Sequence, residues 1–389
     1  MFRKQRIPGL FLLFLIACFP LFGAEKEKQV NLSPYLMTKP QVLFSIKYGD
    51  KPSEIGLWIP GPEEGEPTTI SDFAIGADGS IYIADRVNRK IKRFNRQGKL
   101  LMCTEDVLDG IEAIGVNKKG QIFVIYFGNS SRSNQIAVYD EKGKRVSDSE
   151  KRIEKLLEDL TVTDSLVKIE MRGIKRIPGL TWIWCDQSDN IYLRGGNIVF
   201  KIDAELKSAS AFKKEFPYPS GRYSYNLLPA ERYAENILYY LDGSVYKLQM
   251  PVLQLTEITV YNKSGSITKK FLLPKEGFSD IEKMVPIVSG GFLVDGKGNF
   301  YNIRYPLVCY ANPLDKGKGL ATNHFNALLE YDREGRFVGV RAIFDGFWIR
   351  GDRQIEVDPQ GNVYYLDFKS DHVDVMMAPA PKEGVKRNK

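Results

Sequence analysis

The chain has 389 residues, of which 43% are hydrophobic and 26% are charged, and its formal net charge is +7. This composition excludes a disordered chain and a small disulfide-stabilised domain. The length fits two ordinary domains or one large repeat architecture. With only two histidines, the chain cannot build a metal site from three of its own imidazoles.

The first residues have the three parts of a secretory leader. Basic Arg3, Lys4 and Arg6 precede an apolar run over residues 9–22, and polar residues follow almost at once. The run is shorter than the roughly 20 residues that a membrane-spanning helix needs. We therefore predict an exported protein with residues 1–24 as its leader.

Two processing routes fit this leader. Cys18 ends a Leu-Ile-Ala-Cys segment that resembles the lipobox of bacterial lipoproteins, in which the cysteine is lipidated. Cleavage after Ala24 is the alternative and would release a protein without a lipid anchor. The predicted location is accordingly the periplasm, the outer membrane as a lipoprotein, or the outside of the cell, with residues 25–40 as a linker.

A short unit recurs six times after this linker. Each copy has a strand, a tight polar turn and a second strand, and glycine at the turn permits the positive φ of a hairpin. An apolar and then an aromatic residue follow every turn. The turns are Asp78-Gly79, Lys119-Gly120, Ser188-Asp189, Asp242-Gly243, Lys297-Gly298 and Gln360-Gly361. The aromatic residues are Tyr82, Phe123, Tyr192, Tyr246, Tyr301 and Tyr364.

The copies add up to a closed architecture. A third strand ending in a polar turn follows five copies, the sixth copy lacks a fourth strand, and a spare strand at 42–49 precedes the first. We predict an all-β fold over residues 41–378: a six-bladed β-propeller of four-stranded blades, closed by the N-terminal strand. Loop insertions and one short helix interrupt it, and residues 379–389 form a basic tail.

The first copy carries a family signature. Residues 81–94 read Ile-Tyr-Ile-Ala-Asp-Arg-Val-Asn-Arg-Lys-Ile-Lys-Arg-Phe, which resembles the NHL repeat of six-bladed β-propellers. Copy six keeps Asp367 at the Asp position, and the others keep only the strand and turn pattern. The resemblance implies structural roles within and between blades for Asp85, Asn88, Lys90 and His372.

Three insertions lie between the copies. Residues 149–160 place Ile153, Leu156, Leu157 and Leu160 on one side of a helix, with Ser149 as its N-cap. We expect this helix to pack on a face of the propeller, the alternative being a docking helix for a partner. The third insertion, residues 305–326, has the composition of a surface loop.

The second insertion is rich in tyrosine and arginine. Aromatic residues recur over residues 216–240, interleaved with arginine and stiffened by proline. Because aromatic and arginine side chains dominate binding hot spots, this segment is a candidate binding loop for protein or glycan, and Tyr239 and Tyr240 are expected to pack between blades. The candidate residues are Tyr218, Arg222, Tyr223 and Tyr225.

A second group of candidates is expected at the mouth of the central channel. Counting back from the turns along each innermost strand gives Asp72, Glu112, Trp182, Glu235, Asn236 and Arg353. The oxygen-bearing members could converge on calcium, as in lactonase-like six-bladed hydrolases. Arg353 and Trp182 in the same ring argue against a dedicated metal cage.

Other chemistry finds no support in the sequence. Motifs of serine hydrolases, zinc proteases, phosphate loops and EF-hands are absent. Cys103, Cys185 and Cys309 have apolar neighbours and no C-x-x-C spacing, which predicts inert thiols. The leader contributes three positive charges and residues 379–389 a net three, so the body is nearly neutral and no nucleic-acid partner is expected.

The sequence therefore predicts a non-catalytic binding or scaffolding protein of the cell envelope. Its partner is a protein or a glycan, and it needs no cofactor. The alternative is a metal-assisted hydrolase or lactonase that uses carboxylates at the central channel.

Overall fold

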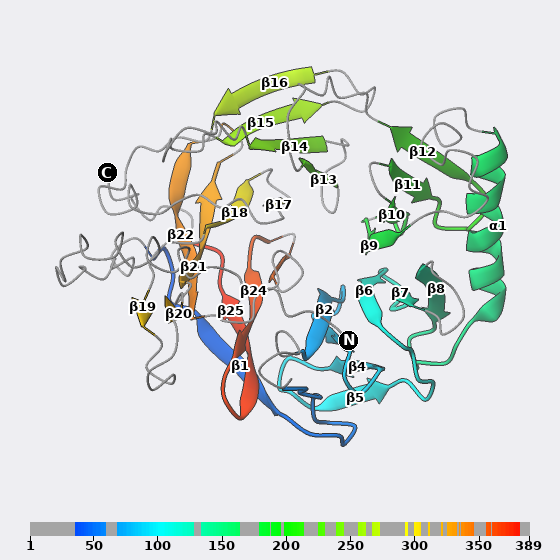
Figure 1. Cartoon of the computed structure of the whole chain (residues 1–389). Coiled ribbons are helices and arrows are strands. Elements are labelled where there is room, and N and C mark those ends of the chain that lie inside the picture. The colour runs from blue at the N-terminus through cyan, green and yellow to red at the C-terminus, as the bar shows by residue number, and fades with distance from the viewer. Residues whose placement is uncertain are drawn as a thin grey trace, which may run out of the picture.

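A computed structural model gives the fold of the chain. The described residues are 36–59, 68–127, 134–163, 179–186, 188–195, 198–213, 225–229, 239–244, 256–261, 267–272, 292–294, 299–304, 310–311, 320–321, 325–332, 334, 336–345, 355–358 and 360–381. Most of them belong to antiparallel β-sheets (Figure 1).

The first half of the chain forms three sheets whose strands follow the chain order. The first contains β2 (Ile70–Ile75), β3 (Ile81–Asp85), β4 (Lys90–Phe94) and β5 (Leu100–Cys103). The second contains β6 (Ile111–Val116), β7 (Ile122–Phe127) and β8 (Asn134–Tyr139). The third contains β9 (Leu180–Cys185), β10 (Ile191–Gly195), β11 (Ile198–Ile202) and β12 (Ala209–Lys213).

Two further four-stranded sheets follow. The fourth contains β13 (Tyr225–Pro229), β14 (Tyr239–Ser244), β15 (Thr256–Tyr261) and β16 (Ile267–Leu272). The fifth contains β17 (Phe292–Val294), β18 (Phe300–Arg304), β21 (Phe325–Tyr331) and β22 (Phe337–Asp345). Between β18 and β21 lies a short ladder of β19 (Tyr310–Ala311) and β20 (Leu320–Ala321).

The sixth sheet joins the two ends of the described chain. It contains β23 (Ile355–Val357), β24 (Val363–Phe368) and β25 (His372–Ala378), and β1 (Gln41–Lys47) pairs antiparallel with β25. Phe44 and Ile46 of β1 are buried in one apolar cluster with Phe73 and Ile81 of the first sheet. In Figure 1 the sheets stand around a common centre, with β2, β6 and β9 nearest to it, which is the arrangement of β-propeller blades.

Most turns of the repeat share one hydrogen-bonding scheme. An Asp or Asn side chain opens the turn, and its Oδ1 accepts hydrogen bonds from backbone N–H groups two or four residues further on, as at Asp186 and Asp140. The first turn opens with Gly76 instead, and Asp78 accepts the Ser80 N–H. A residue with positive φ follows. It is Gly79, Gly98, Gly120, Gly143 and Gly361 in the first, second and sixth sheets, but Asp189 (φ 61°) and Leu206 (φ 56°) in the third.

The recurring aromatic residue anchors the turn that precedes it. Tyr192 Oη donates to Asp186 Oδ2 at 3.1 Å, and Tyr364 Oη donates to Asp358 Oδ2 at 3.2 Å. Tyr82 holds the same position, and burial raises its pKa to about 12. The aromatic pattern of the repeat therefore has a structural cause, since the ring is buried in the core and, at Tyr192 and Tyr364, the hydroxyl group also holds the turn.

The fourth copy departs from this pattern. Asp242 and Gly243, expected at a hairpin turn, lie inside β14, where both pair with β13 on one side and β15 on the other. Pairing on both edges imposes an extended backbone and overrides the local preference of Asp-Gly for a turn. Tyr225, expected in a loop, is the first residue of β13.

One helix covers the open edge of the second sheet. Helix α1 (Ser147–Thr163) takes the place of a fourth strand and contacts β8, β11 and β12 at the rim of the molecule (Figure 1). The predicted helix is confirmed, but its position on a face and the N-cap at Ser149 were wrong, since the helix starts at Ser147. No helix among the described residues is long and apolar enough to cross a bilayer.

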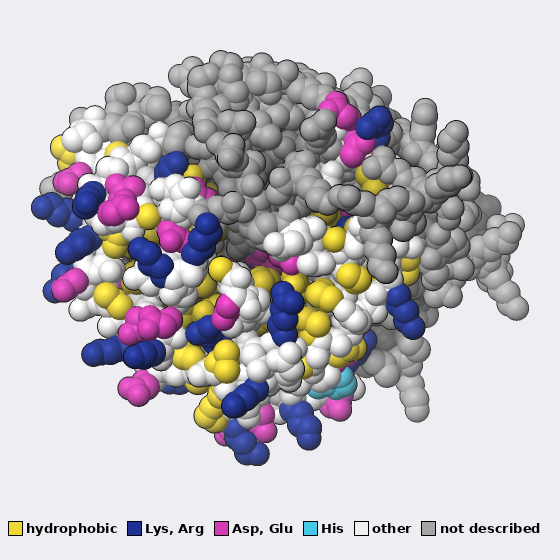
Figure 2. All heavy atoms as spheres, turned by 180° about the vertical axis from the view of Figure 1, so that it is seen from behind, with side chains coloured by type: hydrophobic (Ala, Val, Ile, Leu, Met, Phe, Trp, Pro, Cys, Tyr) yellow, Lys and Arg dark blue, Asp and Glu magenta, His cyan; other side chains and the backbone are white. Residues whose placement is uncertain are grey.

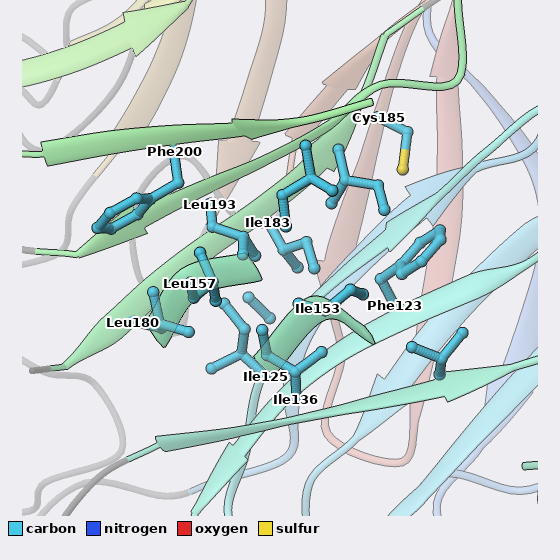
Figure 3. Packing of buried hydrophobic residues seen from close by; sticks show 14 of the residues in the cluster. Phe123, Ile125, Ile136, Ile153, Leu157, Leu180, Ile183, Cys185, Leu193 and Phe200 are labelled. Carbon is cyan, nitrogen blue, oxygen red and sulfur yellow. The ribbon is translucent and has the colours of Figure 1, made fainter. Parts of the chain in front are cut away.

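The helix is held by apolar packing and by one buried carboxylate. Ile153 and Leu157 enter a core with Ile136 of the second sheet and Phe200 of the third (Figure 3). Glu150 Oε1 accepts the Val138 N–H of edge strand β8 at 3.0 Å and pairs with Arg145. The outer edge of β8 is thereby covered, which protects it from pairing with other chains.

The described cysteines fit the inert interpretation. Cys103 and Cys185 are not joined to other cysteines, and the second is buried, whereas Cys309 lies outside the described residues. Burial raises the pKa of the Cys103 thiol, so little thiolate forms near neutral pH.

The Asp of the first copy holds a buried charge cluster. Asp85 Oδ2 pairs with Lys92 Nζ at 2.7 Å, and both side chains are almost fully buried. Asp85 also accepts hydrogen bonds from Gly56 N and Asn88, and Lys92 donates to the carbonyl oxygen of Glu54. Asp85 has the structural role that the resemblance implies, and its buried basic partner is Lys92. Lys90 instead donates to the carbonyl oxygens of Glu105 and Asp106.

We predict that Asp85 and Lys92 are strongly coupled. Lys92→Met and Asp85→Asn should each cost about 3–5 kcal/mol, because each leaves a buried charge without its partner. The double variant should lose less than the sum of the two. Urea unfolding followed by tryptophan fluorescence measures this, with Lys51→Met at the exposed Lys51–Glu54 pair as the unaffected control. Additive losses would contradict the coupling.

Candidate functional site

The innermost strands of the first three sheets begin with the same irregularity. In each, one residue is bulged out of the ladder with the second strand: Ser71 in β2, Glu112 in β6 and Thr181 in β9. A β-bulge turns a side chain out of the regular alternation and often marks a functional edge. The bulges place the predicted residues Asp72, Glu112 and Trp182 at the same end of three neighbouring strands.

Asp72 joins two sheets. Its side chain is buried, Oδ2 accepts the Ile114 N–H of β6 at 2.8 Å, and Oδ1 accepts the adjacent Phe73 N–H at 2.9 Å. Gly115, the next residue in β6, allows a close approach of the third sheet, because a Cβ there would lie 3.1 Å from the Trp184 Cα. Asp72 therefore fastens β2 to β6, which explains its burial without a ligand.

Glu112 takes part in an ion pair at the same end of the sheets. Its Oε1 lies 3.2 Å from Arg86 Nη1, with 19% of the glutamate and 33% of the arginine side chain exposed. A second ion pair, Arg89 with Asp109, joins the turn between β3 and β4 to the segment before β6. These four described charges are opposite in sign and paired with one another.

Trp182 provides an aromatic surface on β9. The residue is partly exposed and pairs across the ladder with Arg194 of β10. It packs against Trp184 and Tyr192, whose rings are stacked at 5.3 Å with planes 7° apart. The stack restrains Trp182, while neighbouring Thr181 is exposed.

Several predicted site residues cannot be placed. Tyr225 lies on β13, but its side chain is outside the described set. Among the described residues, no group of three or more His, Cys, Asp or Glu side chains is arranged to hold a metal ion. The predicted site residues that lie wholly outside the described residues are Cys18, Tyr218, Arg222, Tyr223, Glu235, Asn236 and Arg353.

The two faces of the molecule differ in the connections they carry. Strands alternate in direction, so the first and third turns of every sheet lie on one face, here called the turn face. The second turn and the link to the next sheet lie on the other, the connection face. The turn face has short turns at 76–80, 95–99, 117–121, 186–190, 203–208, 332–336 and 358–362, with 230–238 as a longer exception.

On the connection face, long stretches of sequence separate the described strand ends at 48–69, 214–224, 245–255, 273–291, 305–324 and 346–354. The separations at 86–89, 104–110, 128–133, 196–197 and 369–371 are short. Of the three insertions that the sequence predicts, residues 305–326 begin after the second strand of the fifth sheet and residues 216–240 begin after the fourth strand of the third sheet. The helix differs, because it follows β8, the third strand of its sheet.

On the turn face, polar groups form hydrogen bonds with one another across the boundaries between sheets. Asp189 of the third sheet accepts the Lys118 N–H of the second at 2.7 Å. Arg93 donates to the Glu141 carbonyl oxygen, and Arg96 donates to Tyr364 Oη, each across a sheet boundary. The starts of the inner strands, with Glu112, Thr181 and Trp182, open instead on the connection face.

Exposed apolar side chains also occur on the molecular surface. Trp58, Ile59 and Phe127 have 45%, 71% and 42% of their surface exposed, and all three lie in or beside segments of the connection face. The view from behind shows hydrophobic side chains gathered toward the middle of the described surface, with most Lys and Arg toward its periphery (Figure 2).

Comparison with known proteins shows distant similarity in structure only. No family model and no curated protein matches the chain. It is similar to virginiamycin B lyase from Staphylococcus aureus (11% identity, 87% and 98% of the two chains, TM-score 0.39). It is also similar to a gluconolactonase from Xanthomonas campestris (11% identity, 88% and 99%, TM-score 0.40) and to the Dos1 propeller (9% identity, 81% and 80%, TM-score 0.38).

We predict different effects of substitution at the two carboxylates of the inner strands. Asp72→Ala should destabilise the protein by about 1–3 kcal/mol, because the buried Ile114 N–H loses its acceptor. Glu112→Gln should cost about 0–1 kcal/mol, since its ion pair is partly exposed. Thermal unfolding measures both.

The same measurement tests the metal alternative. Added calcium should leave the unfolding temperature of the wild type unchanged. A rise with calcium that disappears in Asp72→Ala and Glu112→Gln would contradict a structural role for these carboxylates.

Proposed function

We propose that the chain is a closed six-bladed β-propeller with an NHL-like first blade. The six described sheets would be its blades, with α1 in place of one outer strand. The pairing of β1 with β25 supports closure, because it places the two ends of the chain in one sheet. Closure of this kind removes exposed sheet edges.

We further propose that this propeller binds a protein or a glycan at the cell envelope through its connection face, without catalysis. The supporting observation is that most of the described strand ends separated by long stretches of sequence lie on this face, whereas those on the turn face are mostly joined by short turns. In repeat proteins, insertions on one face commonly form the binding surface. The envelope location rests on the leader at residues 1–24.

The contacts of the inner strands favour binding over hydrolysis. Catalysis through a channel metal would need several carboxylates free to coordinate one ion. Asp72 is hydrogen-bonded to β6, and Glu112 pairs with Arg86. Trp182, restrained by aromatic packing, is suited to stacking against a ligand ring or side chain.

The proposal predicts a loss of ligand capture from changes on one face only. The chain from residue 25 is immobilised and used to capture protein from solubilised envelopes and to probe a glycan array. Trp182→Ala and the triple variant Tyr218→Ala, Arg222→Ala, Tyr223→Ala should lower affinity by roughly tenfold or more. The triple variant leaves β13 intact, which deletion of the whole tyrosine-rich segment would not.

The matched control lies on the turn face. Lys118→Ala with Lys119→Ala changes two exposed residues there and should leave capture unchanged. Equal losses in the control, or undiminished capture by all the variants, would refute the assignment of the connection face. Turnover of a lactone substrate that depends on Asp72 or Glu112 would favour the hydrolase alternative.

A further inference from the structure

Two tryptophans lie near the centre of the connection face. Trp58, 45% exposed, exchanges backbone hydrogen bonds of 2.8 and 2.9 Å with Thr68, just before β2 begins. Partly exposed Trp182 lies at the start of β9. The strands β2, β6 and β9 stand nearest the common centre (Figure 1), and Asp72 and Gly115 bring them together. The two tryptophans therefore belong to the strand starts on either side of β6.

The charge cluster of the first copy fixes the position of Trp58. Gly56, two residues before it, donates its N–H to Asp85, and the Gly56 carbonyl oxygen accepts the Thr69 hydroxyl group at 2.7 Å. Arg86 follows Asp85 directly in the chain. Trp58 and Arg86 are thus attached to the same two groups, at the connection-face end of the first sheet.

Polar side chains belong to the strand starts between the two tryptophans. The bulges turn Ser71, Glu112 and Thr181 out of their ladders. Arg86 holds the Glu112 carboxylate at 3.2 Å. A ligand hydroxyl group both donates and accepts hydrogen bonds, so it can bond to both members of this ion pair. An apolar side chain placed there would remove water from the pair and replace none of its hydrogen bonds.

The formal charges of the described residues at these strand starts cancel. Arg86 and Arg194, the cross-strand neighbour of Trp182, balance Glu112 and buried Asp72. Such a surface offers no net attraction to a charged ligand. A ligand that is uncharged and rich in hydroxyl groups matches it better than an acidic or a basic one.

The aromatic cluster around Trp182 has hydrogen-bonding capacity that the described chain does not use. Trp184 is 7% exposed and packs with Trp182, and its Nε1 is buried without a hydrogen-bond partner among the described residues. Buried donors in proteins are nearly always paired. An oxygen-rich ligand at this cluster would supply the missing acceptor.

We propose that this region binds a neutral oligosaccharide. Sugar rings pack their C–H faces on Trp58 and Trp182, because an indole ring offers a large flat apolar surface. Hydroxyl groups of the ligand bond to Arg86, Glu112 and Thr181, which fix its orientation. The inference rests on the proposed function, since it names the class of ligand that the connection face takes.

Isothermal titration calorimetry tests the ligand class on the chain from residue 25, which contains every described element. The probes are neutral oligosaccharides of glucose, galactose, mannose and N-acetylglucosamine, with an oligogalacturonate as the acidic comparison. At least one neutral probe should bind. Added salt should leave its affinity unchanged, because salt screens only interactions between charges.

Trp58→Ala and Trp182→Ala should each weaken binding by roughly tenfold or more. Trp58→Phe and Trp182→Phe keep an aromatic ring and should retain most of the affinity. Glu112→Ala should weaken binding by roughly tenfold, because a charged acceptor is lost. The matched control is Leu101→Ala on outer strand β5, which is 46% exposed and should leave the affinity unchanged. Thermal unfolding checks that each variant is folded.

A failure of every neutral probe to bind would overturn the inference, as would binding that neither tryptophan change weakens. Binding of the acidic probe alone, lost on addition of salt, would contradict the neutral ligand class. Capture of an envelope protein that depends on Trp182, without oligosaccharide binding, would overturn this inference and leave the proposed function standing with a protein ligand. The proposed function itself fails on a separate result, undiminished capture by all the connection-face variants.

Discussion

The pairing of β1 with β25 is the interaction on which the rest of the structure depends. It joins residues more than three hundred positions apart in the chain into one antiparallel ladder. Through it Phe44 and Ile46 reach the core of the first sheet, so the pairing supplies both an outer strand to the sixth sheet and apolar cover to its neighbour. Hydrogen bonds from Arg341 of β22 and from Thr38 to the Pro379 carbonyl oxygen then fix the ends beside it.

Two kinds of contact connect the sheets once the ends are paired. On the turn face, backbone N–H groups, carboxylates and tyrosine hydroxyl groups satisfy one another across sheet boundaries, as between Asp189 and Lys118. Near the centre, Asp72 and Gly115 bring the inner strands together. The contacts on the turn face depend on short turns of fixed conformation. The connection face does not need such turns, so insertions are tolerated there.

Much of the fold could be predicted because its signals are local. Turn residues with positive φ, alternating strands and the aromatic residue after each turn are all visible within a dozen residues. Features decided by distant partners could not be predicted. From the sequence, Lys92 has the features of a solvent-facing strand residue, but in the fold Asp85 and the Glu54 carbonyl oxygen surround its ammonium group. Asp72 has the features of a channel ligand, but its carboxylate accepts the Ile114 N–H. The predicted turn at Asp242-Gly243 was wrong for the same reason, because pairing with β15 gives these residues an extended conformation.

Closure of the ring by the N-terminal strand is the central claim, and an engineered disulfide tests it most directly. Val42 and Met376 are register partners across β1 and β25. The account predicts that Val42→Cys with Met376→Cys oxidises to an intramolecular disulfide, found by peptide mapping, and unfolds at a higher temperature than its reduced form. The out-of-register pair Val42→Cys with Asp374→Cys should stay reduced. Absence of the first disulfide, or equal formation of both, would contradict closure through this strand pair.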